Sequence, residues 1–472
     1  MSERTKLFVS IVIPLLVWIM PTSWVPLDGI TVVEHRLIAI FVFAALFWIL
    51  EPIPIFATSL LIILLELVLV SDSALILFRA GEANPGFGTL LSYESVMATF
   101  ASPIILLFLG GFFLAMAATK YRLDVNMARI LLRPFGTQPR YILLGMMLIT
   151  SVFSMFMSNT ATTAMMLAIL APVLASFDQK DPIRTAFVLA IPFAANIGGI
   201  GTPIGTPPNA IALKYLTGDI AIGFGAWMSF AVPFALVLLL FTWVLLLRKY
   251  PADADSLSLQ IKGRFLKNWK AYTVYAVFAV TIFLWLSDFL HGMKSYVVAM
   301  IPVAVFSATR VITTEDLKRI SWDVLWLVSG GIALGLGLEE SGLAQRLIDS
   351  IPFAVLPEVL IVVAATLLAI TMASLMSNTA TANLLLPLVA ALGASLPGLA
   401  GIGGEMMVIL VVTIACSLAM PLPISTPPNA MAHATGMVDS RQMARSGLVI
   451  GAAGLLTAYL LMFVLNQVGF FH

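Results

Sequence analysis

The chain has 472 residues, of which 60% are hydrophobic and only 10% are charged, and its formal net charge is +1. A soluble globular protein carries about 25% charged residues, so this chain lacks the polar side chains needed to cover a water-facing surface. The composition excludes a soluble domain and predicts a polytopic membrane protein embedded in a lipid bilayer, and no basic patch indicates nucleic acid as a partner.

Apolar runs of about 20 residues, the length that crosses a bilayer core, recur along the whole chain. The first run, 7–25, lacks a small-residue cleavage site and leads into more such runs, so we interpret it as a membrane helix and not as a signal peptide. Further apolar spans are expected at 37–50, 55–70, 104–118, 141–175, 187–200, 224–247, 271–290, 296–309, 324–338, 359–392, 407–420 and 448–468.

Two of these runs, 141–175 and 359–392, are too long for one bilayer crossing and hold polar SNT motifs near their middles. Each is therefore predicted to form two helices that meet at a polar tip inside the membrane, which is a re-entrant hairpin. Irregular backbone at that depth is tolerated only where protein or a water-filled cavity satisfies its polar groups. The SNT motifs are therefore candidates for the lining of a site.

Three patterns recur in the two halves of the chain at a nearly constant offset of 219 or 220 residues. LFLGGFFLAMA (107–117) resembles LVSGGIALGLG (327–337), SNTAT begins at 158 and again at 377, and GTPPNAIAL (205–213) resembles STPPNAMAH (425–433). A constant offset between several patterns indicates a tandem duplication. Proline stops the preceding helix, so each TPPN motif is predicted to break a helix within its repeat.

The duplication predicts five consecutive parts. In chain order they are N-terminal scaffold helices (1–92), a first repeat (93–218) with a hairpin (141–175) and a broken helix (187–217), scaffold helices with a cytoplasmic loop (219–320, loop 248–270), a second repeat (321–437) with a hairpin (359–392) and a broken helix (407–436), and a C-terminal helix (438–472).

Charge predicts the relative orientation of the repeats. The connector 120–140 carries five Lys or Arg against one Asp, whereas the matching connector 339–358 carries four acidic residues against one Arg. Short cytoplasmic loops are rich in Lys and Arg, so the first hairpin should enter from the cytoplasm and the second from outside. We therefore expect inverted repeats in a bacterial-style inner (plasma) membrane, with the N-terminus cytoplasmic and the C-terminus outside.

Inverted repeats are typical of secondary transporters, whose sites lie near the membrane midplane where the repeats meet. The half-helices that begin at the TPPN motifs offer free N–H groups, which attract anions. Freed carbonyls and the oxygens of Ser and Asn suit a cation such as sodium. No Lys or Arg lies in or next to the SNT and TPPN motifs. The motifs therefore predict one cavity that binds an anion together with cations.

SNTATTAMML, SNTATANLLLP, GTPPNA and STPPNA resemble the signature motifs of the divalent anion/sodium symporter family, the solute-carrier-13-like, INDY-type di- and tricarboxylate transporters. The resemblance covers nearly the whole chain. It implies an all-α, inverted-repeat homodimer of the elevator type, with about 11 transmembrane helices and two re-entrant hairpins. The implied activity is sodium-coupled symport of C4 dicarboxylates such as succinate, malate and fumarate across the plasma membrane.

The resemblance also implies a role for individual residues. Substrate carboxylates would be bound by Ser158, Asn159, Thr160, Thr206, Pro207, Ser377, Asn378, Thr379, Thr426 and Pro427. One co-transported sodium ion would be bound by Ser154, Ser158, Asn159 and Gly205. The other would be bound, largely through backbone carbonyls, by Ala373, Met376, Asn378 and Ser425.

Other functions stay open at this point. Ala373 stands where the resembling sodium-coupled proteins tend to carry a hydroxyl, which keeps a sodium-independent dicarboxylate exchanger as an alternative. Sulfate or another oxyanion is a further alternative for the same fold. An enzyme is disfavoured because serine chemistry needs an activating base, and only His433 lies near a motif. A channel is disfavoured because inverted hairpins around a closed central site indicate alternating access.

Several polar residues outside the motifs allow two interpretations. Asn196 and Thr202 precede the first helix break and either line the cavity or pack against other helices. Glu66 lies within an apolar run, where a structural or dimer contact competes with a functional role. Glu51 precedes Pro52 at a predicted helix end and is interpreted as interfacial. The glycine pairs 110–111 and 330–331 are interpreted as close-packing positions.

Overall fold

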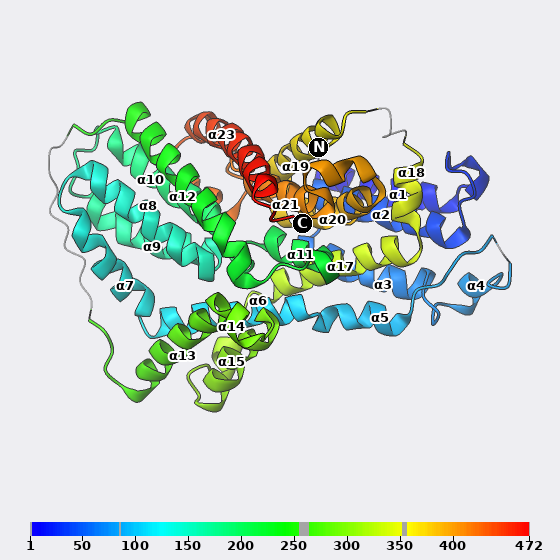
Figure 1. Cartoon of the computed structure of the whole chain (residues 1–472), viewed down its shortest axis with the longest axis horizontal. Coiled ribbons are helices and arrows are strands. Elements are labelled where there is room, and N and C mark those ends of the chain that lie inside the picture. Colours follow the sequence, from blue (N-terminus) through cyan, green and yellow to red (C-terminus); the bar gives the residue numbers. More distant parts are fainter. Residues whose placement is uncertain (1, 85, 254–263, 352–355, 472) are drawn as a thin grey trace.

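The computed structural model describes residues 2–84, 86–253, 264–351 and 356–471. Within these ranges the regular structure is helical, and the β pairing is an isolated bridge between Ser71 and Leu91. The α-helices are α1 (Glu3–Ile19), α2 (Val32–Leu50), α3 (Ile55–Leu69), α4 (Ile76–Arg79), α5 (Tyr93–Ala98), α6 (Pro103–Lys120), α7 (Leu123–Leu132), α8 (Pro139–Phe156), α9 (Asn159–Leu174), α10 (Ile183–Gly199), α11 (Pro207–Tyr215), α12 (Phe224–Lys249), α13 (Trp269–Leu286), α14 (Asp288–His291), α15 (Ser295–Ala308), α16 (Thr314–Leu317), α17 (Trp322–Glu340), α18 (Leu343–Asp349), α19 (Glu358–Leu375), α20 (Asn378–Ser395), α21 (Gly404–Ser417), α22 (Pro427–Ala434) and α23 (Ser440–Gln467) (Figure 1).

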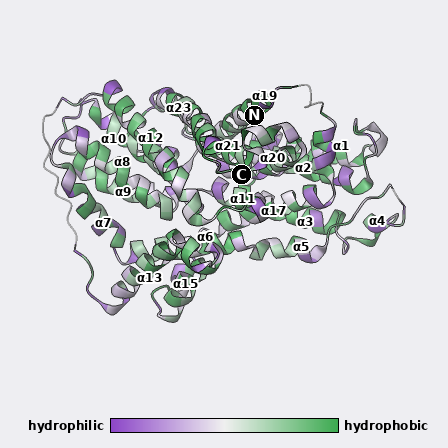
Figure 2. Cartoon of the chain, in the orientation of Figure 1, coloured by the Kyte–Doolittle hydropathy of each residue, from purple (hydrophilic) through white to green (hydrophobic). Residues whose placement is uncertain are grey.

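The composition of the helices confirms the prediction of an all-helical polytopic membrane protein. Within the described ranges, eight helical spans are long and apolar enough to cross a membrane, and five shorter apolar helices accompany them. Much of the length of the long helices is coloured as hydrophobic in Figure 2, as expected for helices that face lipid or other helices. Residues 254–263 of the predicted loop 248–270, residues 352–355 of the connector 339–358, and residue 472 lie outside the described residues.

Helix ends follow the local sequence. The first helix ends at Ile19 and not near residue 25 as predicted, because the residue before Pro21 is held in an extended conformation, with ψ of 147° at Met20. The second helix begins earlier than predicted, at Val32, where Thr31 and Glu34 form a capping box. It ends at Leu50, and the next residue, Glu51, is exposed and has a left-handed backbone conformation, with φ of 48°.

Each of the two long SNT-containing runs folds as two helices, α8 with α9 and α19 with α20. Ser158 and Ser377 stand at the junctions in extended conformation, and their side chains accept hydrogen bonds from the backbone N–H groups of Ala161 and Ala380. A serine in this position caps a helix N-terminus, which explains why the second helix of each pair begins at the asparagine of SNT.

The TPPN motifs also separate helices, α10 from α11 and α21 from α22. Asparagine side chains satisfy the carbonyls that each break sets free. The Nδ2 group of Asn209 donates to the carbonyls of Gly199, Ile200 and Thr202 over 3.1, 3.1 and 2.8 Å. Its counterpart, Asn429 Nδ2, donates to Met420 and Leu422 over 2.9 and 3.0 Å. The asparagine of each motif therefore holds the preceding segment against the new half-helix.

The glycine pairs pack α6 and α17 closely against their neighbours. A Cβ atom at Gly110 would overlap the carbonyl of Ala299 on α15, and one at Gly330 would overlap Ser59 on α3. The two contacts occupy equivalent positions in the two repeats. Larger side chains at these glycines would force the helix pairs apart, so the close-packing interpretation agrees with the structure.

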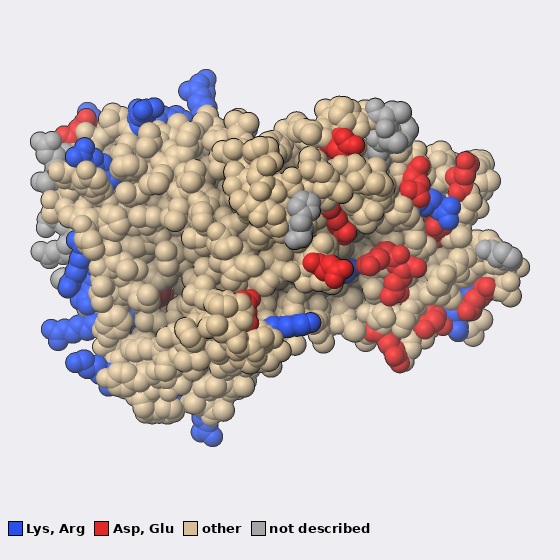
Figure 3. Space-filling model, viewed as in Figure 1, with Lys and Arg blue, Asp and Glu red and all other residues tan. Residues whose placement is uncertain are grey.

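The two hairpins lie in opposite halves of the molecule. In Figure 1, α8 and α9 lie in one half along the long axis and α20 in the other, while the α10–α11 and α21–α22 breaks lie between them. On the face shown in Figure 3, Lys and Arg gather at the end formed by α7 to α10, and Asp and Glu gather over the end that holds α1 to α5 and α18. On this face, the molecule therefore has a basic end and an acidic end at opposite ends of its long axis.

Candidate functional site

One cavity of about 360 Å³ collects residues from both hairpin tips and both helix breaks. Its polar lining comes from both repeats, whose matching segments are about 220 residues apart in the chain. The residues that line it and belong to the four motifs are Ser158, Asn159, Thr160, Gly205, Thr206, Pro207, Ser377, Asn378, Thr379, Ser425, Thr426, Pro427 and Pro428. The cavity thus contains all ten residues predicted to contact substrate.

The residues predicted to bind cations divide into two groups. Ser158, Asn159, Gly205, Asn378 and Ser425 line the cavity. Ser154, Ala373 and Met376 do not line it and are buried behind it, with exposed fractions of 0%, 0% and 3%. Within the described ranges, no group of three or more His, Cys, Asp or Glu side chains is arranged to hold a metal ion. Asp323 is the one acidic residue in the described lining of the cavity, and the other polar side chains there are hydroxyls and amides.

Several oxygens converge beside the first hairpin tip. Ser154 Oγ donates to the Ala195 carbonyl over 2.7 Å and lies against the side-chain amide of Asn159. The amide atom of Asn159 that faces this cluster lies 3.0 Å from the carbonyl oxygen of Gly205 and 3.2 Å from that of Ala195. A nitrogen at this position donates to the carbonyls, whereas an oxygen there adds to a cluster that suits a hard cation.

This cluster depends on Gly199. A Cβ atom on Gly199 would lie 2.7 Å from Asn159 Oδ1 and 2.9 Å from the Gly205 carbonyl oxygen. Such distances are shorter than side-chain packing permits, so α10 approaches the hairpin tip closely only because residue 199 has no side chain.

The second hairpin tip is built differently. Ser425 Oγ donates to the Ser374 carbonyl over 2.9 Å, while Ser374 Oγ donates within its own helix to the Ile370 carbonyl over 2.7 Å. The hydroxyl of Ser374 therefore does not replace the one that is missing at Ala373. Asn378 Oδ1 is buried and has no hydrogen-bond partner in the described part of the chain, so an acceptor is left free at this tip.

The two helix breaks are joined by Asn196. This residue is 2% exposed, lines the cavity, and donates from Nδ2 to Thr426 Oγ1 over 3.1 Å and to Asn429 Oδ1 over 3.2 Å. Both of its alternative roles, cavity lining and packing against another segment, are thus observed. Thr202, by contrast, hydrogen-bonds the Met155 carbonyl and does not line the cavity.

Cationic side chains line a second cavity beside the site, and they come from a part of the chain that the motifs do not include. A second cavity, of about 340 Å³, shares Phe112, Ser158 and Ser321 with the first and is also lined by Lys120 and Arg319. Lys120 forms an ion pair with Asp316 in the same wall. Lys120 and Arg319 lie outside the sequence motifs, and only helix packing places them around the same cavity as Ser158.

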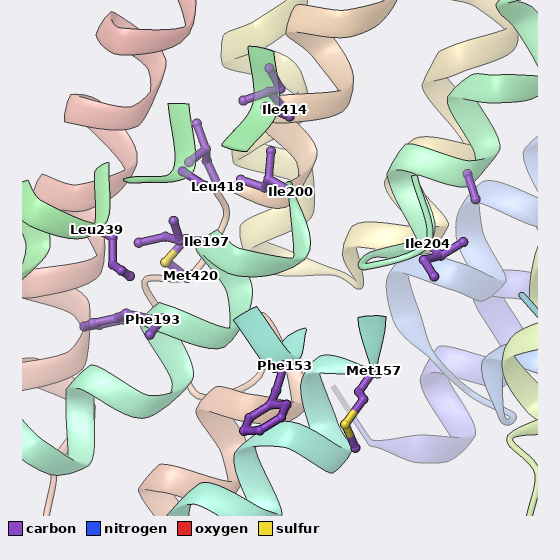
Figure 4. Packing of buried hydrophobic residues seen from close by; sticks show 14 of the residues in the cluster. Phe153, Met157, Phe193, Ile197, Ile200, Ile204, Leu239, Ile414, Leu418 and Met420 are labelled. Carbon is purple, nitrogen blue, oxygen red and sulfur yellow. The ribbon is translucent and has the colours of Figure 1, made fainter. Parts of the chain in front are cut away.

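An apolar shell surrounds the polar lining. Figure 4 shows Phe193 and Ile197 of α10, and Ile200 directly after it, in one buried cluster with Leu418 and Met420, which follow α21. Met157, next to the first SNT motif, belongs to the same cluster and is 3% exposed. A low-dielectric shell of this kind strengthens the hydrogen bonds and ion contacts made inside the cavity.

Glu66 lies outside the cavity. Its side chain is fully buried on α3, and neither carboxyl oxygen has a hydrogen-bond partner among the residues that the structure describes. A Cβ atom on Gly337 of α17 would lie 2.9 Å from Glu66 Oε1, so this carboxyl group fills the space beside a glycine. Glu66 therefore contacts the α3–α17 interface and not the candidate site.

Comparison with known proteins identifies the family. Residues 1–467 match the model of the sodium:sulfate symporter transmembrane region. The chain belongs to this family. Members of the family are transporters, so the chain is a transporter and not an enzyme.

Relatives agree with this placement, and a solved structure shares the fold. The chain is 32% identical to the sodium-dependent dicarboxylate transporter SdcS of Staphylococcus saprophyticus, with 91% of this chain and 85% of SdcS covered. It is 31% identical to SdcS of Staphylococcus aureus strain USA300, with the same coverage. Its fold is similar to that of the Alcanivorax borkumensis YdaH transporter, with a TM-score of 0.54, 13% identity, and 80% of this chain and 88% of that chain covered.

Proposed function

We propose that this protein transports C4 dicarboxylates, such as succinate, malate and fumarate, into the cell together with sodium ions. The observation that carries the proposal is the convergence of both SNT motifs and both TPPN motifs on one cavity of about 360 Å³. A cavity of this size lies at the small end of the range for small-molecule sites.

The two-fold character of the lining supports a substrate with a carboxylate at each end. Ser158, Asn159 and Thr160 lie at one tip, and their counterparts Ser377, Asn378 and Thr379 lie at the other. Hydroxyl, amide and backbone N–H groups all donate to carboxylate oxygens. The relatives named sodium-dependent dicarboxylate transporters, at 31% and 32% identity, support the same substrate class.

The oxygen cluster around Asn159 supports sodium as the coupling ion. Its neutral oxygens, from Ser154 and from the carbonyls of Ala195 and Gly205, are of the type that half-helix breaks offer to sodium in secondary transporters. The Asn159 amide oxygen, when it faces this cluster, would be a further neutral ligand for the ion.

Charge supports the orientation in the membrane. The basic end in Figure 3 should face the cytoplasm, because short cytoplasmic loops are rich in Lys and Arg. From the charges of the connectors in the sequence we also propose that the N-terminus is cytoplasmic and the C-terminus outside. The second cavity, with Lys120 and Arg319, would lead from the substrate site toward the cytoplasm.

We also propose an elevator mechanism in a homodimer, and this part of the proposal rests on the family and the paired repeats.

Uptake of radiolabelled succinate into proteoliposomes tests the proposal. An inward sodium gradient is compared with an equal potassium gradient, with and without dicarboxylate inside the vesicles. Symport predicts uptake that requires sodium, does not require internal dicarboxylate, and saturates with succinate. Excess unlabelled sulfate in a parallel experiment should leave this uptake unchanged, whereas strong inhibition would redirect the proposal to an oxyanion carrier of the same fold.

One observation favours a second candidate, a sodium-independent dicarboxylate exchanger. Ala373 offers no hydroxyl at the second hairpin tip, and Ser374 directs its hydroxyl into its own helix. Uptake that ignores sodium but requires internal dicarboxylate would establish the exchanger and remove the cation assignments.

A further inference from the structure

The two threonines of the TPPN motifs, Thr206 and Thr426, differ in their hydrogen bonds. Both line the cavity and both are largely buried, with exposed fractions of 3% and 5%. The side chain of Thr206 makes no capping hydrogen bond to α11. The side chain of Thr426 accepts from the backbone N–H of Asn429 over 3.3 Å and from Asn196 Nδ2 over 3.1 Å.

The direction of the Asn196–Thr426 hydrogen bond follows from the neighbouring amide. Asn429 donates through Nδ2 to the carbonyls of Met420 and Leu422, which only accept, so its Oδ1 must face Asn196. An acceptor facing Asn196 requires a donor there. The group that Asn196 presents to Asn429 is therefore its NH₂ group, whose second hydrogen points to Thr426 Oγ1.

Two donors occupy both acceptor sites of the Thr426 hydroxyl. A hydroxyl oxygen has two lone pairs and one hydrogen. With both lone pairs taken by Asn196 and the Asn429 N–H, the Thr426 hydroxyl can act toward the cavity only as a donor. A group held as a donor matches an ionised carboxylate and rejects a ligand group that must itself donate.

We infer that Asn196 is a positioning residue that fixes the Thr426 hydroxyl as a hydrogen-bond donor to one end of the substrate. This inference rests on the proposed function, since it takes Thr426 as a contact of the bound anion. Asn196 acts through Thr426. It also joins the two repeats, because α10 belongs to the first and Thr426 to the second.

The second TPPN threonine, Thr426, has an asparagine that fixes its hydroxyl, but the first, Thr206, has no equivalent asparagine. The position equivalent to Asn196, at an offset of 220, is Cys416, whose side chain is fully buried in α21. A thiol is at most a weak donor. The Thr206 hydroxyl therefore keeps its acceptor capacity, and the two ends of the cavity differ in what they select.

Two variants test the inference in proteoliposomes that take up succinate. Asn196→Ala removes the donor, and we expect the KM for succinate to rise about tenfold, the effect of one weakened hydrogen bond to a charged group. Asn196→Asp keeps the shape but reverses the hydrogen bond and adds negative charge, so its KM should rise further. Cys416→Ala, the matched change in the other repeat, should leave the KM unchanged.

A double-mutant cycle separates positioning from general packing. In a Thr426→Val background, Asn196→Ala should cause no further rise in KM, because the hydroxyl on which it acts is gone. The maximal rate should stay within twofold in Asn196→Ala, and the increase in unfolding temperature that sodium causes in the absence of succinate should be unchanged. A structural role of Asn196 in α10 would alter this sodium effect, because Ala195 belongs to the oxygen cluster.

The outcomes are distinct. Wild-type protein that fails to take up succinate defeats the proposed function and not this inference. If wild-type protein is active and Asn196→Asp matches its KM, the inference is wrong. Additive effects of Asn196→Ala and Thr426→Val would also contradict it. If Asn196→Ala does not yield folded protein by size-exclusion chromatography, the isosteric Asn196→Asp variant and its cycle with Thr426→Val decide.

Discussion

The two repeats share their geometry and differ in their chemistry. Each places a serine cap at a hairpin tip and an asparagine behind a helix break, and each packs a glycine pair against a neighbouring helix. Yet Lys120 at the end of α6 corresponds to Glu340 at the end of α17, because the two helix ends lie toward opposite ends of the molecule. Duplication has preserved backbone-determining residues, while the side chains around them have adapted to their surroundings.

The same contrast appears inside the cavity. Ser154 and Gly199 in the first half correspond to Ala373 and Ala419 in the second. Each half therefore has one hydroxyl that the other lacks, Ser154 in the first and Ser425, the counterpart of Gly205, in the second. The close approach of α10 to the hairpin tip, which needs Gly199, belongs to the first half. We infer from this difference that the first half binds its cation more tightly.

The largest expected effect is the loss of transport when the asparagine of either SNT motif, a feature that both halves share, is removed. Asn159→Ala and Asn378→Ala should each abolish sodium-driven succinate uptake, because each removes the amide at one hairpin tip. Both variants should still elute as folded protein of wild-type size. Normal transport by either variant would show that the cavity assigned here is not the substrate site.

A glycine substitution would test the close approach in the first half. Gly199→Ala should lower uptake by about 10- to 100-fold, since overpacking costs about 1–3 kcal/mol and the added Cβ would meet Asn159 Oδ1 at 2.7 Å. Initial rates of succinate uptake measure this effect. Gly401→Ala is the control, because nothing lies within 4 Å of a Cβ at that position. Equal activity of the two variants would contradict the assigned packing.

A pair of hydroxyl changes would sharpen the difference between the two cation sites. Ser154→Ala should raise the sodium concentration for half-maximal uptake by about tenfold, the loss of one favourable oxygen contact. Ala373→Ser adds a hydroxyl to the second half and should lower that concentration by about two- to threefold. The sodium dependence of uptake at fixed succinate measures both. If the two substitutions shift it in the same direction, the proposed inequality between the halves is wrong.

The smallest expected effect is on the rate at which the substrate anion approaches the cavity from the basic end of the molecule. Arg319→Gln should raise the KM for succinate about two- to threefold at low ionic strength and have little effect at high ionic strength, because long-range attraction is screened by salt. Lys318→Gln makes the same change in net charge at the neighbouring residue, which pairs with Glu315 and does not line the cavity. If the KM for succinate changes equally in the two variants, the effect of Arg319 comes from net charge and not from its place in the cavity wall.

Much of the architecture was predictable because it depends on local chemistry. The composition alone indicated the membrane class. Prolines placed the helix breaks at the TPPN motifs, and the length of the two SNT-containing runs, with their polar middles, placed the breaks at the SNT motifs. Helix ends were less predictable where capping decided them, as at Thr31 and before Pro21. Asn196 was left between two roles because its partners lie 230 and 233 residues away.

The sequence by itself determined that this is a duplicated, all-helical membrane protein with four polar helix interruptions, since those features follow from hydropathy, repetition and backbone restrictions. Only the tertiary structure decided which side chains meet: Asn196 with Thr426, Gly199 with Asn159, and Arg319 beside the wall that holds Ser158. These contacts join elements distant in the chain, and their distances depend on how whole helices pack, which no local pattern encodes.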